Sequence, residues 1–270
     1  MAKILHYKIF SMIIRIVSIA LTTYILFGAF LYFNQRSMIY YPSDQDFQRC
    51  DGFSDYEKRG FKRTRFYYKQ GAQNHVIVYY HGNGGSACDR SAIKSLFEQS
   101  HATVLFVEYA GYSNDDRKPS QNLILEDVRH IHEYISRGGY EHVTVYGQSI
   151  GAAAASYHAS LGNVDQLLLV TPFSSLVDVA QSKFPLYPAS LLLREKYDAV
   201  EWVQRYDGSL LILHGDRDRI IPNELSKKLF SASPSTEKDY VLIHDVGHND
   251  IWSSPQFHSA VIEYVNEIRR

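Results

Sequence analysis

The feature that most constrains this chain is a series of short apolar runs from residue 76 onward, separated by stretches of helical length. The runs are rich in β-branched and aliphatic residues and do not alternate with polar ones, unlike a half-exposed strand. Near-continuous apolar character is typical of strands buried on both faces of a parallel sheet. The six runs are Val76–Tyr80, Thr103–Val107, Val143–Tyr146, Leu167–Val170, Leu210–Leu213 and Tyr240–Ile243.

The clearest helix between these runs is predicted from about Ser120 to Arg137. Ser120 is a plausible N-cap, apolar residues recur at three- and four-residue steps, and two glycines follow Arg137. Strands that alternate with such helices predict an α/β fold, with a mostly parallel sheet and helices on both faces. Ligands of these folds bind beyond the carboxyl ends of the strands, so the functional residues should follow the runs directly.

The N-terminus carries a second long signal. Residues 9–33 are apolar except for Arg15 and a few hydroxyl side chains, and residues 16–33 carry no charge. This length matches the ~18 or more residues that span a bilayer as a helix. A cleaved signal peptide and a buried core helix are the alternatives, but no cleavage pattern and no polar face are evident. We therefore expect an uncleaved transmembrane signal anchor.

Basic residues around this segment indicate its orientation. Lys3, Lys8 and Arg15 precede the uncharged stretch, and Arg36 and Arg49 follow it. The excess on the first side favours a cytoplasmic N-terminus and an extracytoplasmic or lumenal main domain.

The expected organisation has four parts: an N-terminal tail (1–8), the anchor (9–33), a connector with edge strands (34–73) and an α/β core (74–270). Inside the connector, residues 61–68 are expected to form an edge strand or hairpin. A short cap is expected at about 178–205. Its apolar, proline-containing sequence either lines an acyl pocket or forms a packed helical excursion.

Charge and cysteine content exclude several functions. A net charge of −1 gives no basic surface for nucleic acid. Cys50 and Cys88 are too few for a four-thiolate zinc site. They could form one bridge in an exported domain, but cysteine counting alone favours two free thiols.

The strongest chemical motif follows the run that ends at Tyr146. It reads Gly147-Gln148-Ser149-Ile150-Gly151, a G-x-S-x-G pattern between a strand and an alanine-rich helix start. This context is that of a nucleophile elbow, in which a strained turn exposes the serine hydroxyl and only small flanking residues fit. Ser149 is therefore the candidate nucleophile.

A glycine-rich turn, His81 to Gly85, follows the first run. Such a turn can direct a backbone N–H towards a reacting carbonyl. We expect Asn83, with Gly84 as the alternative, to form an oxyanion hole together with the N–H of Ile150. A phosphate-binding loop is the competing interpretation, but the lysine of that motif is absent.

Two further loops complete the candidate site, in the chain order Ser, Asp, His. A serine hydroxyl needs a base, and the base needs a carboxylate to fix its tautomer. Asp218 is the preferred acid over Asp216, because Asp216 falls at the turn itself. His248 is the preferred base over His244, which adjoins the strand.

These residues resemble the α/β-hydrolase-fold serine hydrolases from about residue 37 onward. More narrowly, they resemble single-pass α/β-hydrolase-domain proteins distantly related to prolyl-oligopeptidase-type peptidases. The matching stretches are Tyr40-Tyr41-Pro42 after the membrane helix, the turn at His81–Gly85, and Tyr109-Ala110-Gly111-Tyr112, in which the family's arginine is missing. The resemblance implies an α/β-hydrolase fold and supports Asp218 and His248.

The resemblance further implies hydrolysis of a carboxylic ester or thioester through an acyl-enzyme, without a metal or organic cofactor. The expected partners are a small-molecule, lipid or acylated substrate and a membrane, with no nucleic acid. Two alternatives stay open: a membrane-tethered binding scaffold without activity, and an aminopeptidase-like amide hydrolase.

Overall fold

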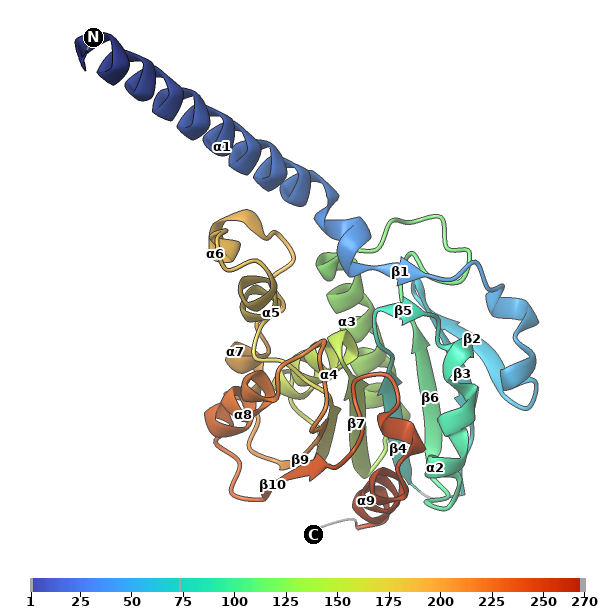
Figure 1. The fold of residues 1–270 in the computed structure, drawn as a ribbon. Coiled ribbons are helices and arrows are strands. Elements are labelled where there is room, and N and C mark those ends of the chain that lie inside the picture. Colours follow the sequence, from blue (N-terminus) through green and yellow to red (C-terminus); the bar gives the residue numbers. More distant parts are fainter. Residues whose placement is uncertain (1, 73, 268–270) are drawn as a thin grey trace.

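The computed structural model describes residues 2–72 and 74–267. An eight-stranded sheet forms the centre, in the order β10-β9-β8-β7-β4-β6-β3-β2 (Figure 1). Its strands are β2 (Glu57–Phe61), β3 (Thr64–Lys69), β4 (His75–Tyr80), β6 (Thr103–Glu108), β7 (His142–Gln148), β8 (Gln166–Val170), β9 (Ser209–Gly215) and β10 (Lys238–Ile243). The six strands from β4 onward pair in parallel, which confirms the predicted mostly parallel sheet.

The edge of this sheet is antiparallel. β2 and β3 form a hairpin that overlaps residues 61–68, where an edge strand or hairpin is expected, and β3 pairs antiparallel with β6. The tight turn contains Lys62 with a positive φ of 54°. β4, β6, β8 and β9 are buried along their whole length, and β7 is buried after its first residue, as the near-continuous apolar runs predict.

Helices cover both faces of the sheet (Figure 1). One hydrophobic core includes apolar side chains of α3, α4, α7 and α8, and the other includes those of α2 and α9. The helices of these two layers are α2 (Ser95–Glu98), α3 (Gln121–Gly138), α4 (Ile150–Ser160), α7 (Ala199–Val203), α8 (Asn223–Ala232) and α9 (Pro255–Asn266).

The helix α3 forms where the sequence predicts it. The Ser120 hydroxyl accepts a hydrogen bond from the N–H of Leu123 at 3.4 Å, and the helix ends at Gly139 in the left-handed conformation. Its apolar stripe of Ile124, Val128 and Ile131 is buried against the sheet.

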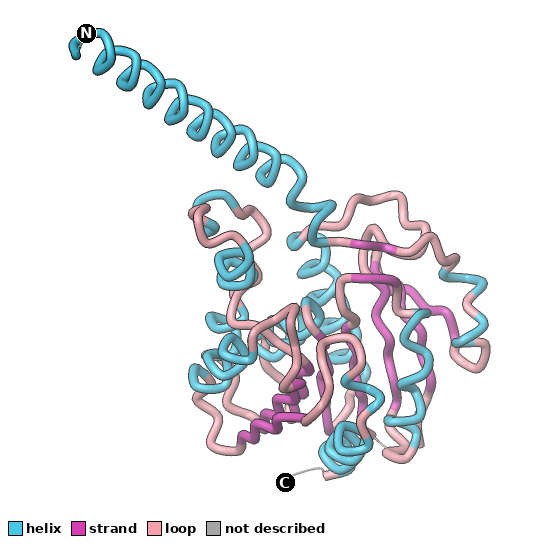
Figure 2. Tube along the Cα trace, viewed as in Figure 1, coloured by secondary structure: helices cyan, strands magenta, loops and turns pink. Residues whose placement is uncertain are grey.

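The N-terminal helix α1 (Ala2–Ile39) projects from the body of the domain (Figure 2). It is 38 residues long, so it continues past the predicted segment 9–33 and includes most of the predicted N-terminal tail. Its most apolar window has no buried residue, and the helix is long and apolar enough to cross a membrane. An exposed apolar surface of this kind distinguishes α1 from a core helix.

A small excursion follows β8 and lies beside α1. It contains α5 (Leu176–Lys183), in which no residue is buried, and the short α6 (Ala189–Leu192), and both fall near the predicted cap (Figure 1). We call residues 176–193 the cap. It packs on α1 rather than closing over the sheet.

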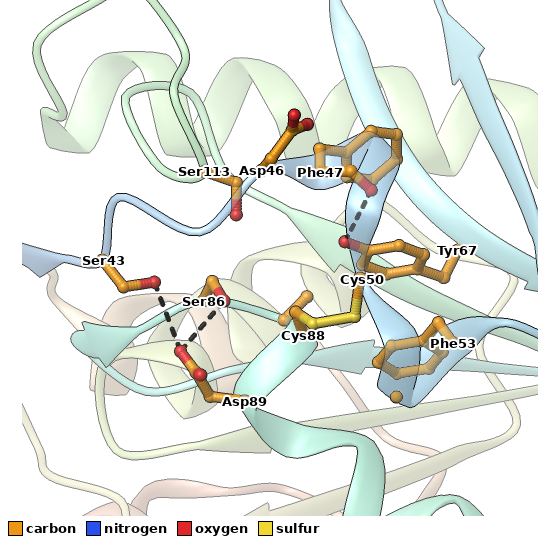
Figure 3. The surroundings of a disulfide bond; sticks show 12 residues. Ser43, Asp46, Phe47, Cys50, Phe53, Tyr67, Ser86, Cys88, Asp89 and Ser113 are labelled. Carbon is orange, nitrogen blue, oxygen red and sulfur yellow. Dashed lines mark hydrogen bonds between the residues drawn. A yellow bond between two sulfur atoms is a disulfide. The ribbon is translucent and has the colours of Figure 1, made fainter.

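The expectation of two free thiols is wrong: Cys50 and Cys88 form a disulfide across 38 residues of sequence (Figure 3). The bridge joins the short 3-10 turns Asp51–Phe53 and Cys88–Lys94. A side chain at Gly52 would meet the Ser91 hydroxyl at 2.4 Å, so glycine is what lets the turns approach. Cysteine counting carries no information about which two loops meet, and for that reason it misses this contact.

Candidate active site

Ser149 lies in a sharp turn between β7 and α4, with a φ of 54°. A non-glycine residue rarely adopts this conformation, and it costs about 1–3 kcal/mol. The flanking glycines make the turn sterically possible. A Cβ at Gly147 would lie 2.2 Å from the Gly151 carbonyl oxygen, and a Cβ at Gly151 would lie 2.3 Å from that of Tyr80. The predicted reason for glycine at both positions is therefore visible as close backbone approach.

The structure brings three predicted residues into one hydrogen-bonded chain. Nε2 of His248 lies 3.1 Å from the Ser149 hydroxyl oxygen, and Nδ1 of His248 lies 2.7 Å from Oδ2 of Asp218. Ser149 and His248 are each 8% exposed, so these hydrogen-bonded side chains are largely shielded from solvent but can be reached from one side. Each residue follows a different strand: β7, β9 or β10.

Asp218 is fixed by more than His248. Its Oδ1 accepts the backbone N–H groups of Ile220 and Ile221, both at 2.8 Å, and its Oδ2 lies 3.3 Å from Nε2 of His214. Burial opposes ionisation, but hydrogen bonds from His214 and His248 outweigh it and hold the pKa of Asp218 well below its usual range. The carboxylate is thus charged and held in one orientation.

His214 is a residue that sequence reasoning does not assign. It is the second-last residue of β9 and directly precedes Gly215, with which the strand ends. Its position directly before the Gly-Asp turn is the only sequence signal for its contact with Asp218. That contact depends on the loop folding back across the strand end, which spacing alone does not reveal.

The alternative residues Asp216 and His244 pair with each other. Their side chains are 3.0 Å apart, and Asp216 also accepts the N–H of Asp245. The hydrogen bond from His244 lowers the pKa of Asp216. This second pair lies on the rim, and the His244 side chain is 72% exposed. The structure therefore pairs His248 with Asp218 and not with Asp216.

The two expected oxyanion donors are adjacent to Ser149. Ile150 is the first residue of α4, where a backbone N–H has no acceptor within the helix. Asn83 follows Gly82, at which a Cβ would lie 3.8 Å from that of Ser149. The Asn83 side chain is engaged elsewhere and donates to the Ile39 carbonyl at 2.9 Å, so its backbone N–H is the group left for this purpose.

The loop that carries Asn83 is attached to the segment that follows α1. The strand β1 (Tyr41–Pro42) pairs with β5 (Gly84–Gly85). The Tyr41 N–H donates to the Asn83 carbonyl at 3.1 Å, and the Tyr112 hydroxyl donates to the same oxygen at 2.8 Å. The end of α1 and the residues after it are therefore connected to the candidate oxyanion loop by two hydrogen bonds with Asn83, one from the Tyr41 N–H and one to the Ile39 carbonyl.

A buried pair lies behind this loop and is also absent from the sequence predictions. Nε2 of His81 lies 3.4 Å from Oε1 of Glu108, and neither side chain is exposed. Glu108 also accepts the Ser113 hydroxyl at 2.8 Å and the Ala87 N–H at 3.2 Å. Glu108 thus ties both sides of the glycine-rich turn to the end of β6. The only feature of the sequence that points to this buried pair is His81, the first residue of the glycine-rich turn.

A cavity of about 360 Å³ opens beside Ser149. Its lining combines backbone from the glycine-rich turn with polar and aromatic side chains: Gly82, Asn83, Gly84, Gly85, Arg90, Gln148, Ser149, His248, Asn249 and Trp252. The space admits a small acyl group or leaving group next to the hydroxyl. Within residues 2–72 and 74–267, no three or more His, Cys, Asp or Glu side chains group in a way that could hold a metal ion.

The chain is similar in sequence to known proteins from bacteria and animals. The chain is 27% identical to the uncharacterized protein Rv2307c of Mycobacterium tuberculosis over 233 residues, covering 82% of this chain and 83% of the relative. It is 28% identical to human protein ABHD12B over 222 residues, covering 72% of this chain and 61% of the relative.

Solved structures show the same fold. An esterase from Pyrococcus furiosus superimposes with a TM-score of 0.64 at 13% identity, covering 79% of this chain and 91% of the esterase. The family model described as serine hydrolase (FSH1) matches residues 62–249. The predicted resemblance is confirmed: the chain has the α/β-hydrolase fold and belongs to the serine hydrolase (FSH1) family.

Proposed function

We propose that this hydrolase cleaves carboxylic esters or thioesters through an acyl-enzyme, with Ser149 as nucleophile, His248 as general base and Asp218 as the orienting acid. The observation that carries the proposal is the unbroken hydrogen-bonded chain, with 3.1 Å from Ser149 to His248 and 2.7 Å from His248 to Asp218. These distances lie within or close to hydrogen-bond reach, which the base of a serine nucleophile requires.

In the first step, the Ser149 oxygen attacks the substrate carbonyl carbon while Nε2 of His248 takes the hydroxyl proton. The oxyanion accepts hydrogen bonds from the N–H groups of Asn83 and Ile150. Collapse breaks the bond to the alcohol or thiol, which leaves with the proton from His248. Water then attacks the acyl-serine in the same way, and the carboxylic acid is released while Ser149 regains its proton.

The helix α1 supports the proposal of a membrane-anchored enzyme, because it is long and apolar enough to span and its apolar window is not covered by protein. The excess of lysine and arginine before the span favours a cytoplasmic N-terminus. The Cys50–Cys88 disulfide favours the same orientation, since such bonds persist outside the reducing cytosol. The substrate is then a small, lipid or acylated molecule met outside the cytoplasm.

The direct test is hydrolysis of p-nitrophenyl esters and acyl thioesters of increasing chain length by the detergent-solubilised full chain. Ser149→Ala should lower turnover by about 10⁴-fold or more, because the nucleophile is lost. Ser160→Ala, at the far end of the same helix α4, is the matched control and should keep full activity. Retained activity in Ser149→Ala would refute the assignment.

A further inference from the structure

The cap and the N-terminal helix form one continuous contact. The rings of Tyr24 on α1 and Tyr187 in the cap stack with centroids 4.5 Å apart. Each hydroxyl also donates to backbone of the other element: Tyr187 to the Tyr24 carbonyl at 2.9 Å, and Tyr24 to the Leu186 carbonyl at 2.8 Å. Phe27 adds ring contacts to Phe184 and Tyr187. Residues 184–191, which we call the cap tip, are therefore fixed to a part of α1 inside the apolar segment.

A polar layer lies further along α1. Arg36 pairs with Glu195 at 2.6 Å, and Gln35 accepts the N–H of Arg194 at 2.7 Å. The guanidinium of Arg194 also lies over the ring of Tyr32. Aromatic and basic residues of this kind concentrate at the headgroup level of a bilayer.

The two layers define a depth. With a rise of about 1.5 Å per residue, Tyr24 lies about 18 Å along the helix axis from Arg36. A headgroup layer is only about 5–8 Å thick. When Arg36 lies among the headgroups, the cap tip therefore lies deeper, in the hydrocarbon region of the bilayer.

The surface of the cap tip fits that depth. Leu186 and Leu191 are 79% and 80% exposed, and most of the α1 side chains between residues 16 and 27 are exposed and apolar. A solitary exposed leucine needs no explanation on a soluble surface. Two of them beside the bare face of a candidate membrane helix form a continuous apolar surface, and bilayer hydrocarbon is the solvent that would cover it.

An apolar groove of about 190 Å³ runs between α1 and the cap. Leu31, Met38 and Ile39 of α1 form one wall, and Val179, Phe184 and Leu192 of the cap form the other. The groove and the Ser149 cavity lie on either side of one hydrogen-bonded pair: Ile39 lines the groove, and its carbonyl accepts the side-chain amide of Asn83, which lines the Ser149 cavity.

We propose that the cap tip is embedded in the membrane and that the groove between α1 and the cap holds an acyl chain of a lipid that enters sideways from the bilayer. This inference rests on the proposed membrane anchor and names the substrate class of the Ser149 site as a membrane lipid ester. The anchor helix is then one wall of the substrate site as well as a tether.

The first test measures depth and does not depend on activity. The two native cysteines are bonded to each other, so a single introduced cysteine can be labelled selectively with an environment-sensitive fluorophore. Leu186→Cys reports the cap tip. Thr236→Cys, exposed in the loop before β10, is the control. In phosphatidylcholine–phosphatidylglycerol vesicles, lipids brominated along the acyl chain should quench the label at 186 and leave the label at 236 unchanged. Equal, weak quenching at both positions would overturn the embedding.

The second test narrows the groove. Ala180→Trp places a large ring on a groove-lining position of α5, whereas Ser182→Trp places it on an exposed position of the same helix that does not line the groove. Losing room for two methylenes corresponds to about a tenfold or greater loss of affinity. Ala180→Trp should therefore lower the rate of hydrolysis of a palmitoyl ester in vesicles about tenfold and leave that of a water-soluble acetyl ester unchanged. Ser182→Trp should change neither rate.

The outcomes separate this inference from the proposed function. If both tryptophan variants match the wild type on the palmitoyl ester, the groove is not an acyl site, while acetyl ester hydrolysis still supports the Ser149 mechanism. If the wild type hydrolyses neither ester, the proposed function fails, and the quenching at residue 186 still decides the embedding. A changed oligomeric state of Ala180→Trp in detergent, without a change in chain-length preference, would assign the groove to a second copy and contradict the proposal.

Discussion

Asp218 connects the proposed base to the framework of the molecule. Its two oxygens accept hydrogen bonds from backbone N–H groups and from His248, and His214 lies against the same carboxylate. A base held in this way keeps the tautomer in which Nε2 faces Ser149, and the carboxylate stabilises the imidazolium formed during the reaction. Both effects are electrostatic and directional, so an isosteric neutral group should not replace them.

Asp218→Asn should therefore lower kcat by about 10³- to 10⁴-fold with little change in KM. Steady-state kinetics with a short ester gives the two parameters separately. The matched control is Asp216→Asn, which removes the neighbouring rim carboxylate and should retain activity within about twofold, because surface changes of this kind are small. Equal losses in both variants would remove the special role of Asp218.

Two buried histidines should make the folded chain sensitive to acid. His158 on α4 is fully buried, with Nδ1 2.9 Å from the Tyr80 hydroxyl, and burial lowers its pKa to about 3. Burial likewise lowers the pKa of His75 to about 4. Below the usual value near 6.5, the unfolded chain binds protons at these sites that the folded chain does not. The free energy of unfolding should therefore fall with falling pH from about 6.5, by up to about 1.4 kcal/mol per pH unit for each histidine.

His158→Gln keeps an acceptor for Tyr80 and removes one of these titrations. The free energy of unfolding can be measured by urea titration between pH 4 and pH 7. Plotted against pH below about 6.5, it should have a slope smaller than that of the wild type by up to about 1.4 kcal/mol per pH unit. An unchanged slope would show that His158 is not held neutral in the folded state.

At the scale of elements, the pairing of β1 with β5 is the contact with most bearing on function. It joins the end of α1 to the loop that carries the proposed oxyanion donor. Donors that stabilise developing charge work only when they are held in place before the reaction. The segment after the anchor is thus a positioning element for the glycine-rich turn.

Tyr41→Pro tests this role, because proline removes the N–H that donates to the Asn83 carbonyl. The loss of one hydrogen bond of about 1–1.5 kcal/mol predicts a fall in kcat of about 5- to 10-fold, with KM nearly unchanged. Tyr41→Ala keeps the N–H and removes only a half-exposed ring, so it should match the wild type. A drop in Tyr41→Ala as large as that in Tyr41→Pro would instead assign the effect to the side chain.

Sequence patterns predict the strands, the helices and the nucleophile elbow because each of these requires particular residue types over a short stretch of sequence. Strands buried on both faces require continuous apolar runs, and close backbone approach at Gly147 and Gly151 requires glycine. Contacts between distant loops leave no such record. The pairing of β1 with β5, the contact between His214 and Asp218, and the Cys50–Cys88 bond depend on how loops fold back, and the sequence does not predict them.

At the scale of the whole molecule, the disulfide links the connector after α1 to the turn that follows the glycine-rich loop (Figure 3). The hydroxyls of Ser43 and Ser86 both donate to the Asp89 carboxylate beside it, at 3.3 and 2.9 Å. A bond that closes a loop of this length restricts the unfolded chain more than the folded one.

Cys88→Ser, compared with the wild type under oxidising conditions, should lower the free energy of unfolding by about 3–4 kcal/mol. The Cys50→Ser, Cys88→Ser double variant should lose the same amount, because either substitution removes the one bond. Denaturant titration of both variants measures the loss. A wild type that is equally stable with and without a reductant would contradict a stabilising bridge, and it would also weaken the argument for an extracytoplasmic domain.

Ser149 is proposed to be an activated nucleophile in the folded chain. Incubation of the chain in vesicles with a fluorophosphonate probe, followed by digestion and mass spectrometry, tests it most directly. One adduct is expected, on the peptide containing Ser149; it should disappear in Ser149→Ala and be strongly reduced in Asp218→Asn. No adduct on the wild type, or an adduct on a different serine that persists in Ser149→Ala, would contradict it.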